Sequence, residues 1–459
     1  MGKTIKNIYV ISILALLMGS CVVGGKYQQP TTSLPTEFGN GVITDTTPLV
    51  KWFDLFEDTA LKSIIKITLQ NNKNLLLAGS RVEEASIQTD IIRLNSFPVI
   101  GYDVQAGAGT AKTEARKLGS LNTGLFKAGA FLSWELDIWG KLKHSTESAR
   151  AQFLATSENR TALQVSLVAE AASLYFLLRD LDNRLVIAKR TLVSRKENTK
   201  IINQRVEKGY TADLDRLQAV QQESIAAAFI PNIQRQIIQT ENALNVLMGQ
   251  NPGPIPRGAS IVEQAISTVI PVGLPSQLLQ RRPDLRAAEQ LLRAQYERMG
   301  IAEASRYPSF SLTGLLGFAS PQLGSLLSNG FTATGIAGLT GPIFQFGQNK
   351  KRVEVEKKRV IQIQYQYEQS LLQALADVNN SLTQNLTFTE EYNQRKLQVE
   401  AARQALLLSK ARYDYGYTSY LEVLVQESSL FDAELQESIL LQQRLNAVVS
   451  LYRALGGGW

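Results

Sequence analysis

The sequence has few of the residues from which catalytic and metal sites are commonly built. Its 459 residues include one cysteine, Cys21, and one histidine, His144. A single cysteine cannot form an internal disulfide, and these counts also exclude Cys–His and multi-histidine sites. Acidic residues are scattered over predicted helix faces, and no glycine-rich phosphate loop occurs. The sequence therefore predicts no enzyme, with no catalytic residues, no metal site and no cofactor.

Blocks of one charge and long apolar runs are also missing. The chain has 48 basic and 41 acidic residues, and its net charge of +7 is spread along the sequence. Without a dense basic block, nucleic acid is not an expected partner. After the N-terminus there is no run of about 18 apolar residues, so no helical membrane span is expected. A membrane β-barrel stays open, because its strands give a much weaker signal.

The N-terminus resembles a secretory leader. Lys3 and Lys6 precede the apolar run "IYVISILALL", and small residues then lead to Cys21. This order predicts a signal peptide over residues 1–20. A lone cysteine directly after "MGS" is similar to a bacterial lipoprotein cleavage site, which predicts lipidation of Cys21 as the first mature residue. The alternative is an ordinary leader with an incidental cysteine.

The chain repeats itself. "RVEKGYTADLDRL" at Arg205 recurs as "RYDYGYTSYLEVL" at Arg412, 207 residues later (412 − 205), and "NKNLLLAG" at Asn72 is echoed by "RPDLRAAE" at Arg282, 210 residues later (282 − 72). Internal repetition of this kind predicts two similar structural units in the same order. The predicted segments are an N-terminal tail (21–53), a first repeat (54–253), a linker (254–273) and a second repeat (274–456).

Each repeat contains a long heptad helix. Apolar residues between Leu167 and Leu192 recur every 3.5 residues on average, which is typical of coiled-coil packing. Neither 141–208 nor 348–412 contains a proline or glycine. At 1.5 Å per residue each helix could be about 100 Å long, so it needs partners on neighbouring helices and subunits. Pro231 predicts a kink or interruption in the first returning helix.

Two segments alternate with period two instead. The hairpin predicted at about 98–139 and the one at about 308–346, whose last strand is expected from Phe331 to Phe344, place apolar residues opposite polar or small ones. Strands of about ten residues with this pattern are typical of a membrane barrel. Four strands cannot close a barrel, so closure needs several copies, with two giving eight strands, three giving twelve and four giving sixteen. Eight strands leave an interior filled by side chains, and three copies are the smallest set that leaves a water-filled lumen. The alternative is a pair of hairpins lying on a soluble core.

Six stretches together resemble the TolC-like outer-membrane factors, in the lipoprotein branch that serves resistance-nodulation-division (RND) efflux. These are "GGKYQQP", "WFDLFEDTALKSII", "WELDIWGKL", "LLQRRPDLRAAE", "YPSFSLTG" and "GPIFQFGQNK". The resemblance implies a mainly α fold with a membrane β-barrel portion. A homotrimer would form a twelve-stranded outer-membrane β-barrel continuous with a long periplasmic α-helical barrel. An equatorial domain would come from the tail, the linker and the C-terminal end.

The same resemblance implies a function. The chain would be the exit duct of a tripartite efflux system in the cell outer membrane, inserted in outer-membrane lipid and extending into the periplasm. Its partners would be a periplasmic adaptor (membrane fusion) protein and an inner-membrane RND-type pump. Two alternatives are an exit duct for type I protein secretion and a structural coiled-coil lipoprotein, although the latter has no use for four alternating strands. The exported substrate stays open among drugs, detergents, dyes and metals.

The resemblance also places the gate. It implies that the Gly-Tyr-Thr stretches (about 205–215 and 412–422) are periplasmic tips, turning at Gly209 and Gly416. The lumen-facing positions of the second tip fall on Leu421, Glu422 and Val425. Val425 stands where the family commonly has an acid. An alternative for Glu422, and the better interpretation of Asp215, is a helix-start carboxylate favoured by the helix dipole.

Overall fold

The computed structural model describes residues 23–25, 27–30, 35, 52–111, 121–264, 275–320, 322–329 and 331–457. The predicted signal peptide and Cys21 lie outside these residues. The chain forms two compact units. The described parts of Met1–Thr31, Arg81–Thr156 and Ala287–Glu368 make the first unit, and those of Thr32–Ser80, Ser157–Arg286 and Gln369–Trp459 make the second.

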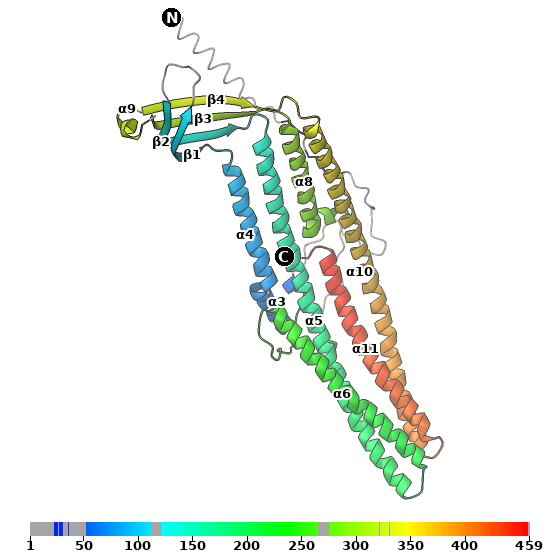
Figure 1. The fold of residues 1–459 in the computed structure, drawn as a ribbon. Helices are drawn as coiled ribbons and strands as arrows, with labels where there is room; N and C mark the ends of the chain where they lie inside the picture. Colours follow the sequence, from blue (N-terminus) through cyan, green and yellow to red (C-terminus); the bar gives the residue numbers. More distant parts are fainter. Residues whose placement is uncertain are drawn as a thin grey trace. The chain divides into compact units, whose positions relative to one another are not determined.

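The longer helices, labelled in Figure 1, form three pairs, and the two helices of each pair have the same number of residues. Lys73–Leu94 (α4) and Pro283–Ala304 (α8) have 22 residues each, and Lys141–Glu207 (α5) and Gln348–Asp414 (α10) have 67 each. The returning helices Asp213–Leu247 (α6) and Tyr420–Ala454 (α11) have 35 each. The shorter helices are α2 (Trp52–Leu55), α3 (Thr59–Asn71), α7 (Leu278–Arg281) and α9 (Leu326–Asn329), with 3₁₀ turns η1 (Ile261–Glu263), η2 (Pro275–Gln277) and η3 (Leu323–Ser325).

The two long helices confirm the heptad prediction. Within α5, Leu167, Ala171, Leu178 and Leu181 are buried, and in α10 Leu371, Ala374, Val378 and Leu382 are buried. In the second unit, this part of α5 shares a hydrophobic core with α3, α6 and α11. One 18-residue window of α5, with mean hydropathy 1.5, has the length and composition of a membrane span, which the sequence did not predict. Half of that window is buried inside the protein, as in the core helix of a helical bundle.

Of the predicted kink or interruption at Pro231, the interruption does not occur, because α6 runs through Pro231 as one helix. Proline removes one helical hydrogen bond. However, Pro231 lies on the exposed side of α6, while Ile233 and Ile237 on the other side are buried in the core. Apolar packing on both sides of the proline therefore holds the helix across it.

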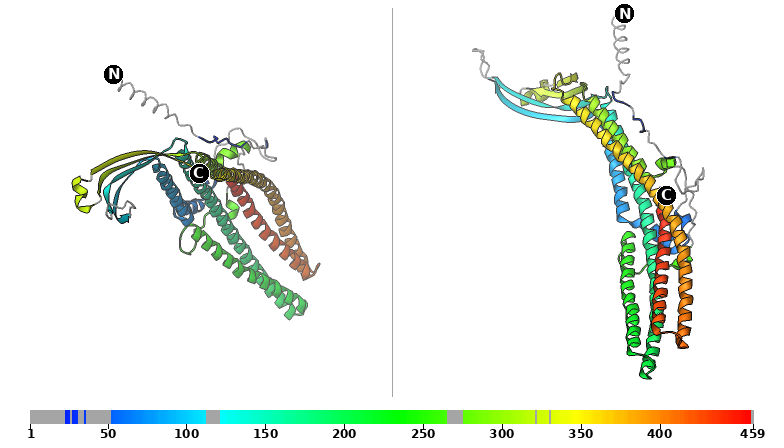
Figure 2. Two further views of the ribbon diagram at one scale, coloured as in Figure 1. Left: turned by 45° about the horizontal axis from the view of Figure 1, so that its top comes forward. Right: turned by 90° about the vertical axis from the view of Figure 1, so that its right-hand side faces the viewer.

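The first unit contains a four-stranded antiparallel sheet with strand order β1-β2-β3-β4. The strands are Val99–Ala111 (β1), Leu121–Leu136 (β2), Ser309–Ser320 (β3) and Phe331–Thr340 (β4). Figure 2 shows the four strands bending together. The middle pair joins the two repeats, since β2 of the first repeat pairs with β3 of the second.

The register of the sheet separates an apolar face from a polar one. Because paired residues point to the same side of a sheet, one face collects apolar residues from all four strands, interrupted by Gly314, Gly335 and Ser320 and, where β1 ends and β2 begins, by Gly124, Asn122 and Thr110. These are Ile100, Tyr102, Val104 and Ala106; Phe126, Ala128, Ala130, Leu132, Trp134 and Leu136; Phe310, Leu312, Leu316 and Phe318; and Phe331, Ala333, Ala337 and Leu339. The opposite face is mainly polar or glycine and includes an ion pair between Lys127 Nζ and Asp103 Oδ2 at 3.1 Å. The predicted alternation is confirmed.

The last strand ends earlier than predicted. It stops at Thr340 rather than Phe344. Gly341 follows, and a Cβ atom there would lie 2.5 Å from Pro308 Cβ. The next residue, Pro342, has no N–H to donate. The partner strand β3 begins at Ser309, opposite Thr340, so the ladder ends there and Pro342 cannot extend it, although Ile343 and Phe344 continue the apolar pattern.

In each repeat a joint links the end of the returning helix to the start of another helix. Asn72 Nδ2 donates to the Leu247 carbonyl at the end of α6, at 2.8 Å. In the second repeat Arg282 Nη1 donates to the Ala454 carbonyl at the end of α11, at 3.1 Å. The joints therefore share a geometry but differ in charge.

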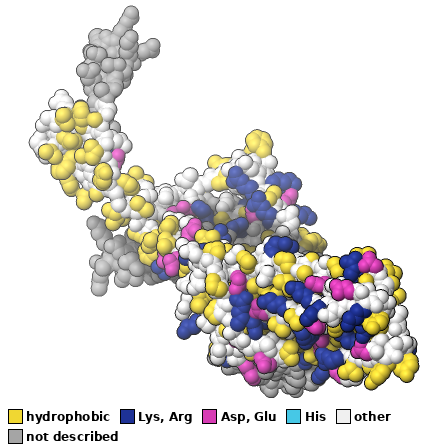
Figure 3. Space-filling view, turned by 90° about the horizontal axis from the view of Figure 1, so that it is seen from below, with side chains coloured by type: hydrophobic (Ala, Val, Ile, Leu, Met, Phe, Trp, Pro, Cys, Tyr) yellow, Lys and Arg dark blue, Asp and Glu magenta, His cyan; other side chains and the backbone are white. Residues whose placement is uncertain are grey.

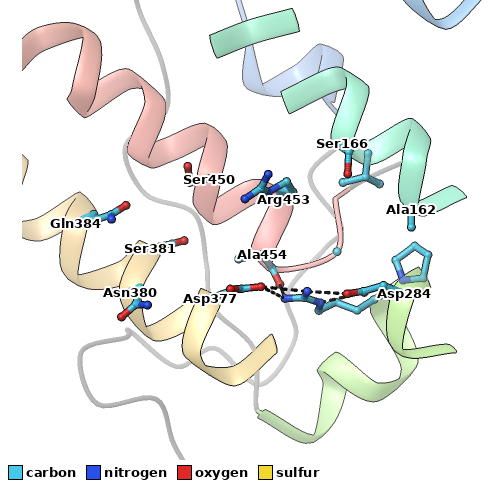
Figure 4. Close-up of a pocket in the computed structure, with 14 residues that line it drawn as sticks. Ala162, Ser166, Asp284, Asp377, Asn380, Ser381, Gln384, Ser450, Arg453 and Ala454 are labelled. Carbon is cyan, nitrogen blue, oxygen red and sulfur yellow. Dashed lines mark hydrogen bonds and ion pairs between the residues drawn. The ribbon is translucent and has the colours of Figure 1, made fainter. Parts of the chain in front are cut away.

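The second joint borders a polar cavity of about 420 Å³ (Figure 4). Arg282 lies in its wall, with Nη2 2.7 Å from Asp284 and 3.3 Å from Asp377. Two carboxylates thus neutralise a largely buried guanidinium, which would otherwise be costly to remove from water. This cluster fixes α8, α10 and the end of α11 together.

Candidate functional site at the two helix turns

The turns between α5 and α6 and between α10 and α11 have the same backbone. Gly209 has φ +72° and Gly416 has φ +76°. The following tyrosines donate back five residues, Tyr210 to the Arg205 carbonyl and Tyr417 to the Arg412 carbonyl, both at 2.8 Å. This is the Schellman pattern, whose left-handed position favours glycine. No atom lies within 4 Å of a Cβ atom built on either glycine, so backbone conformation alone selects this residue.

Each returning helix begins with the same hydroxyl–carboxylate contact. Thr211 Oγ1 donates to Asp215 Oδ2, and Thr418 Oγ1 donates to Glu422 Oε2. Both acids lie in the first turn of their helix, where the dipole favours negative charge. Glu422 therefore has the same helix-start role as Asp215, whatever further role it has.

Leu421 and Val425 form a small exposed apolar patch on the surface of α11. They lie four residues apart on α11, so they share one face of the helix. Each is 54% exposed. Glu422 lies on the adjacent face, directed at Thr418, with its Oε1 3.9 Å from Arg412 Nη1. The apolar pair and the carboxylate are thus neighbours on different helix faces.

The two turns touch through side chains that sequence reasoning missed. Arg205 Nη2 pairs with Asp414 Oδ1 at 3.1 Å, and its guanidinium lies 4.7 Å from the ring centroid of Tyr413. Tyr420 is buried beside Tyr413, with ring centroids 5.4 Å apart, in a small cluster with Ile202. The repeat pattern could not indicate these contacts, since the counterparts of Tyr413 and Tyr420 are Val206 and Asp213.

Beyond the turns, α11 carries two buried acidic residues that form ion pairs with basic side chains of other helices. Glu427 Oε1 lies 2.8 Å from Lys410 Nζ, and Glu434 pairs with Arg190 and with Arg403, the latter at 3.1 Å. The acids are seven residues apart and hence on one helix face. They connect α11 to both long helices above the turns.

A groove of about 700 Å³ lies between the turns and is lined by residues of both, including Arg205, Tyr210, Asp414 and Thr418. On the face shown in Figure 3, basic, acidic and apolar side chains are interspersed. A mixed surface of this kind suits a protein partner better than a polyanion. Within the described residues no group of three or more His, Cys, Asp and Glu residues is placed to hold a metal ion.

Comparison with known proteins gives one consistent picture. The sequence model of a family described as "Outer membrane efflux protein" matches residues 64–250 and 274–457. The chain is 30% identical to the cation efflux system protein CusC of Escherichia coli O6:H1, over 97% of each chain. It is also 30% identical to the solvent efflux pump outer membrane protein SrpC of Pseudomonas putida, over 97% of each, and to the probable outer membrane lipoprotein SilC of Salmonella typhimurium, over 98% of each.

Solved structures agree with the sequence comparisons. The outer-membrane channel OprN has a TM-score of 0.90 at 28% identity, covering 96% of this chain and 100% of that one. The open state of the MtrE outer membrane channel of Neisseria gonorrhoeae has a TM-score of 0.86 at 30% identity, covering 95% and 98%. The architecture is therefore that of an outer-membrane channel with an α-helical part and a β part.

Proposed function

The chain belongs to the outer membrane efflux protein family and is the outer-membrane channel of a tripartite efflux system; we propose that it works as a homotrimer whose passage is gated at the two helix turns. Proteins of this family are transport channels rather than enzymes. The proposed partners are a periplasmic adaptor protein and an inner-membrane RND-type pump. The groove between the turns and its mixed surface suit the adaptor.

The proposal of a trimer rests on the four-stranded sheet. Its apolar face spans four strands, and within the described residues β1 and β4 each have one unpaired edge. Hydrocarbon does not tolerate an open edge, so β4 of one copy must pair with β1 of the next. Three copies give 3 × 4 = 12 strands, enough to close around water. Native mass spectrometry in detergent should find a trimer, and a stable monomer or dimer would contradict the proposal.

The proposed gate rests on the exposure of Leu421 and Val425. In a trimer, three copies of this apolar patch would meet around the three-fold axis and form a constriction that resists wetting. Gly209 and Gly416 would serve as hinges, because glycine adopts left-handed and other backbone conformations without steric cost. Glu422, beside the constriction, would favour cations.

Single-channel conductance in planar bilayers tests this placement. Leu421→Ser should enlarge the conductance, because a hydroxyl lets water enter the constriction. The matched control is Leu214→Ser, at the equivalent position of the first turn, where the leucine is 62% exposed. The control should leave conductance close to that of the parent. Equal effects of the two substitutions would remove the gate from Leu421.

We also propose that the mature chain begins at an acylated Cys21. SilC, a relative over 98% of this chain, is described as a probable outer membrane lipoprotein. Mass spectrometry of the mature N-terminus should find a lipid-modified cysteine. One acyl chain gives only marginal membrane binding, so Cys21→Ala should stay in the membrane through its barrel. An unmodified N-terminus upstream of Cys21 would end this proposal.

A further inference from the structure

The only histidine of the chain is buried among hydrogen-bond partners and closely packed glycines, and the channel function gives it no role. His144 is in the first turn of α5 and is 8% exposed. Its Nδ1 lies 2.5 Å from Glu297 Oε2 on α8, and its Nε2 lies 3.0 Å from the Val23 carbonyl oxygen. The sequence pattern gave His144 no partner. The structure instead makes it the meeting point of three distant segments.

Two glycines shape the site around the imidazole. A Cβ atom on Gly300 of α8 would lie 2.8 Å from the ring. One on Gly24 would lie 3.1 Å from Nε2, and Gly24 has φ +134°, which side chains rarely adopt. The Val23 N–H also donates to the Trp139 carbonyl at 3.2 Å. Residues 23–25, here called the strap, are thus held by α5, α8 and the loop before α5.

The hydrogen-bond partners fix the number of protons. A carbonyl oxygen only accepts hydrogen bonds, and so does an ionised carboxylate. A neutral imidazole carries one N–H and cannot donate to both. The two short contacts together therefore need one proton more than neutral histidine and ionised glutamate supply.

We propose that His144, Glu297 and the Val23 carbonyl form a proton-dependent latch that fastens the strap to α5 and α8. When the extra proton is present, both ring nitrogens donate and the strap is held. When it leaves, the ring keeps one N–H, and either the Glu297 or the Val23 bond is lost. In the sequence, the strap begins two residues after Cys21, the predicted site of lipidation.

The electrostatics agree with this geometry. The hydrogen bond that His144 Nδ1 donates to Glu297 is the largest cause of a raised His144 pKa; burial opposes it, and Val23 and Asp137 add to it. On α8 the facing charge is Glu297, since Arg293 one turn earlier lies 3.8 Å from Glu147 instead. Asp137 faces the ring from the loop before α5, and the strap itself carries no charge. Because the folded-state pKa is raised, the latch is complete below the ordinary value of 6.5 and is lost as pH rises through the folded value.

Nuclear magnetic resonance of the ring nitrogens tests the proton count. The chain has one histidine, so ¹⁵N-histidine labelling of the full-length protein, purified with a tag free of histidine, gives one pair of ring signals. Both nitrogens should be protonated below pH 6.5, the midpoint should lie above 6.5, and Glu297→Gln should move that midpoint down. A midpoint at or below 6.5 would overturn the latch.

A spin label tests whether the strap is fastened. Gly25 has nothing within 4 Å of a built Cβ atom, so Gly25→Cys in the Cys21→Ala chain accepts a label without clashes. The label should be immobilised below pH 6.5 and should lose its immobilised component as pH rises through the His144 midpoint. His144→Ala should cause the same loss below pH 6.5, while Lys143→Ala, on the exposed side of the same helix turn, should not.

A second variant covers the case in which His144→Ala fails to assemble. Glu297→Gln keeps the side-chain shape and removes the charge, so it should shift the release of the label to lower pH. Unchanged label mobility in both His144→Ala and Glu297→Gln would contradict the proposal. So would the same mobility change in Lys143→Ala, since that would indicate a general loosening of α5.

Discussion

The two helix turns share a backbone but differ in the side chains that join them. Both use a left-handed glycine and a threonine that donates to an acid in the first turn of the returning helix. The first turn then sends Arg205 across to Asp414, whereas Arg412 lies near Glu422 of its own turn. Duplication therefore preserved the way the chain reverses, and later divergence made the contact between the turns one-sided. Substitutions at equivalent positions can separate the contribution of the shared backbone turn from that of the side-chain contacts that differ.

The largest difference is expected at the pair Tyr420 and Asp213. Tyr420 is 4% exposed and packs on Tyr413, while its counterpart Asp213 is exposed and pairs with Arg216. Removing a buried aromatic ring costs about 3 kcal/mol or more, so Tyr420→Ala should destabilise the second turn by this amount. Asp213→Ala, at an exposed position, should leave stability close to that of the parent.

Hydrogen exchange of peptides covering the turns measures both changes. A loss of about 3 kcal/mol corresponds to roughly a hundredfold faster exchange where opening limits it. The effect of Tyr420→Ala should appear in both turns, because the cluster that contains Tyr420 also contains Ile202 of α5. Comparable effects of the two substitutions would show that the turns do not differ in this respect.

The glycines should show the opposite behaviour, namely equality. Both adopt left-handed backbones with no neighbour within 4 Å of a built Cβ atom. Gly209→Ala and Gly416→Ala should therefore each cost about 1–2 kcal/mol, from backbone strain alone. The same exchange experiment checks this. Unequal costs would mean that one turn is strained by contacts beyond its own backbone.

What the sequence could predict is what periodicity and repetition record. The heptads of α5 and α10, the alternation in the sheet and the turns at Gly209 and Gly416 are local patterns. Contacts between distant segments left no such pattern. Arg205 meets Asp414 across 209 residues, and His144 meets Glu297 across 153. The same limit explains the end of β4, because the partner strand β3 begins at Ser309, opposite Thr340, and offers no further pair although the apolar pattern continues.

The cross-turn ion pair should have a smaller effect than the glycines. Arg205 and Asp414 are partly exposed, and such pairs contribute about 1 kcal/mol or less. The Tyr413 ring adds a contact of about 0.5–1 kcal/mol to Arg205. Arg205→Gln should therefore loosen the turns modestly, and Arg412→Gln, whose contact is 3.9 Å long, should do less.

A double-mutant cycle with Asp414→Asn isolates the ion pair. The coupling between Arg205 and Asp414 should fall as salt rises, because exposed charges are screened. Coupling between Arg412 and Asp414, measured in the same way, should be near zero. If Arg412 couples to Asp414 as strongly as Arg205 does, the contact between the turns is symmetric after all.

The smallest effect on stability, and the most informative one for transport, concerns Asp215 and Glu422. Both bind the threonine of their turn, so Asp215→Asn and Glu422→Gln should each cost only about 0.3–1 kcal/mol through the helix dipole. Their effects on ion selectivity should differ. Leu421 precedes Glu422, and Val425 offers no second acid, so three copies of Glu422 would supply the negative charge at the proposed constriction. In planar bilayers Glu422→Gln should reduce the preference for cations, and Asp215→Asn should change it little. If Asp215→Asn abolishes cation selectivity while Glu422→Gln leaves it intact, the gate lies on the first turn and the comparison must be reversed.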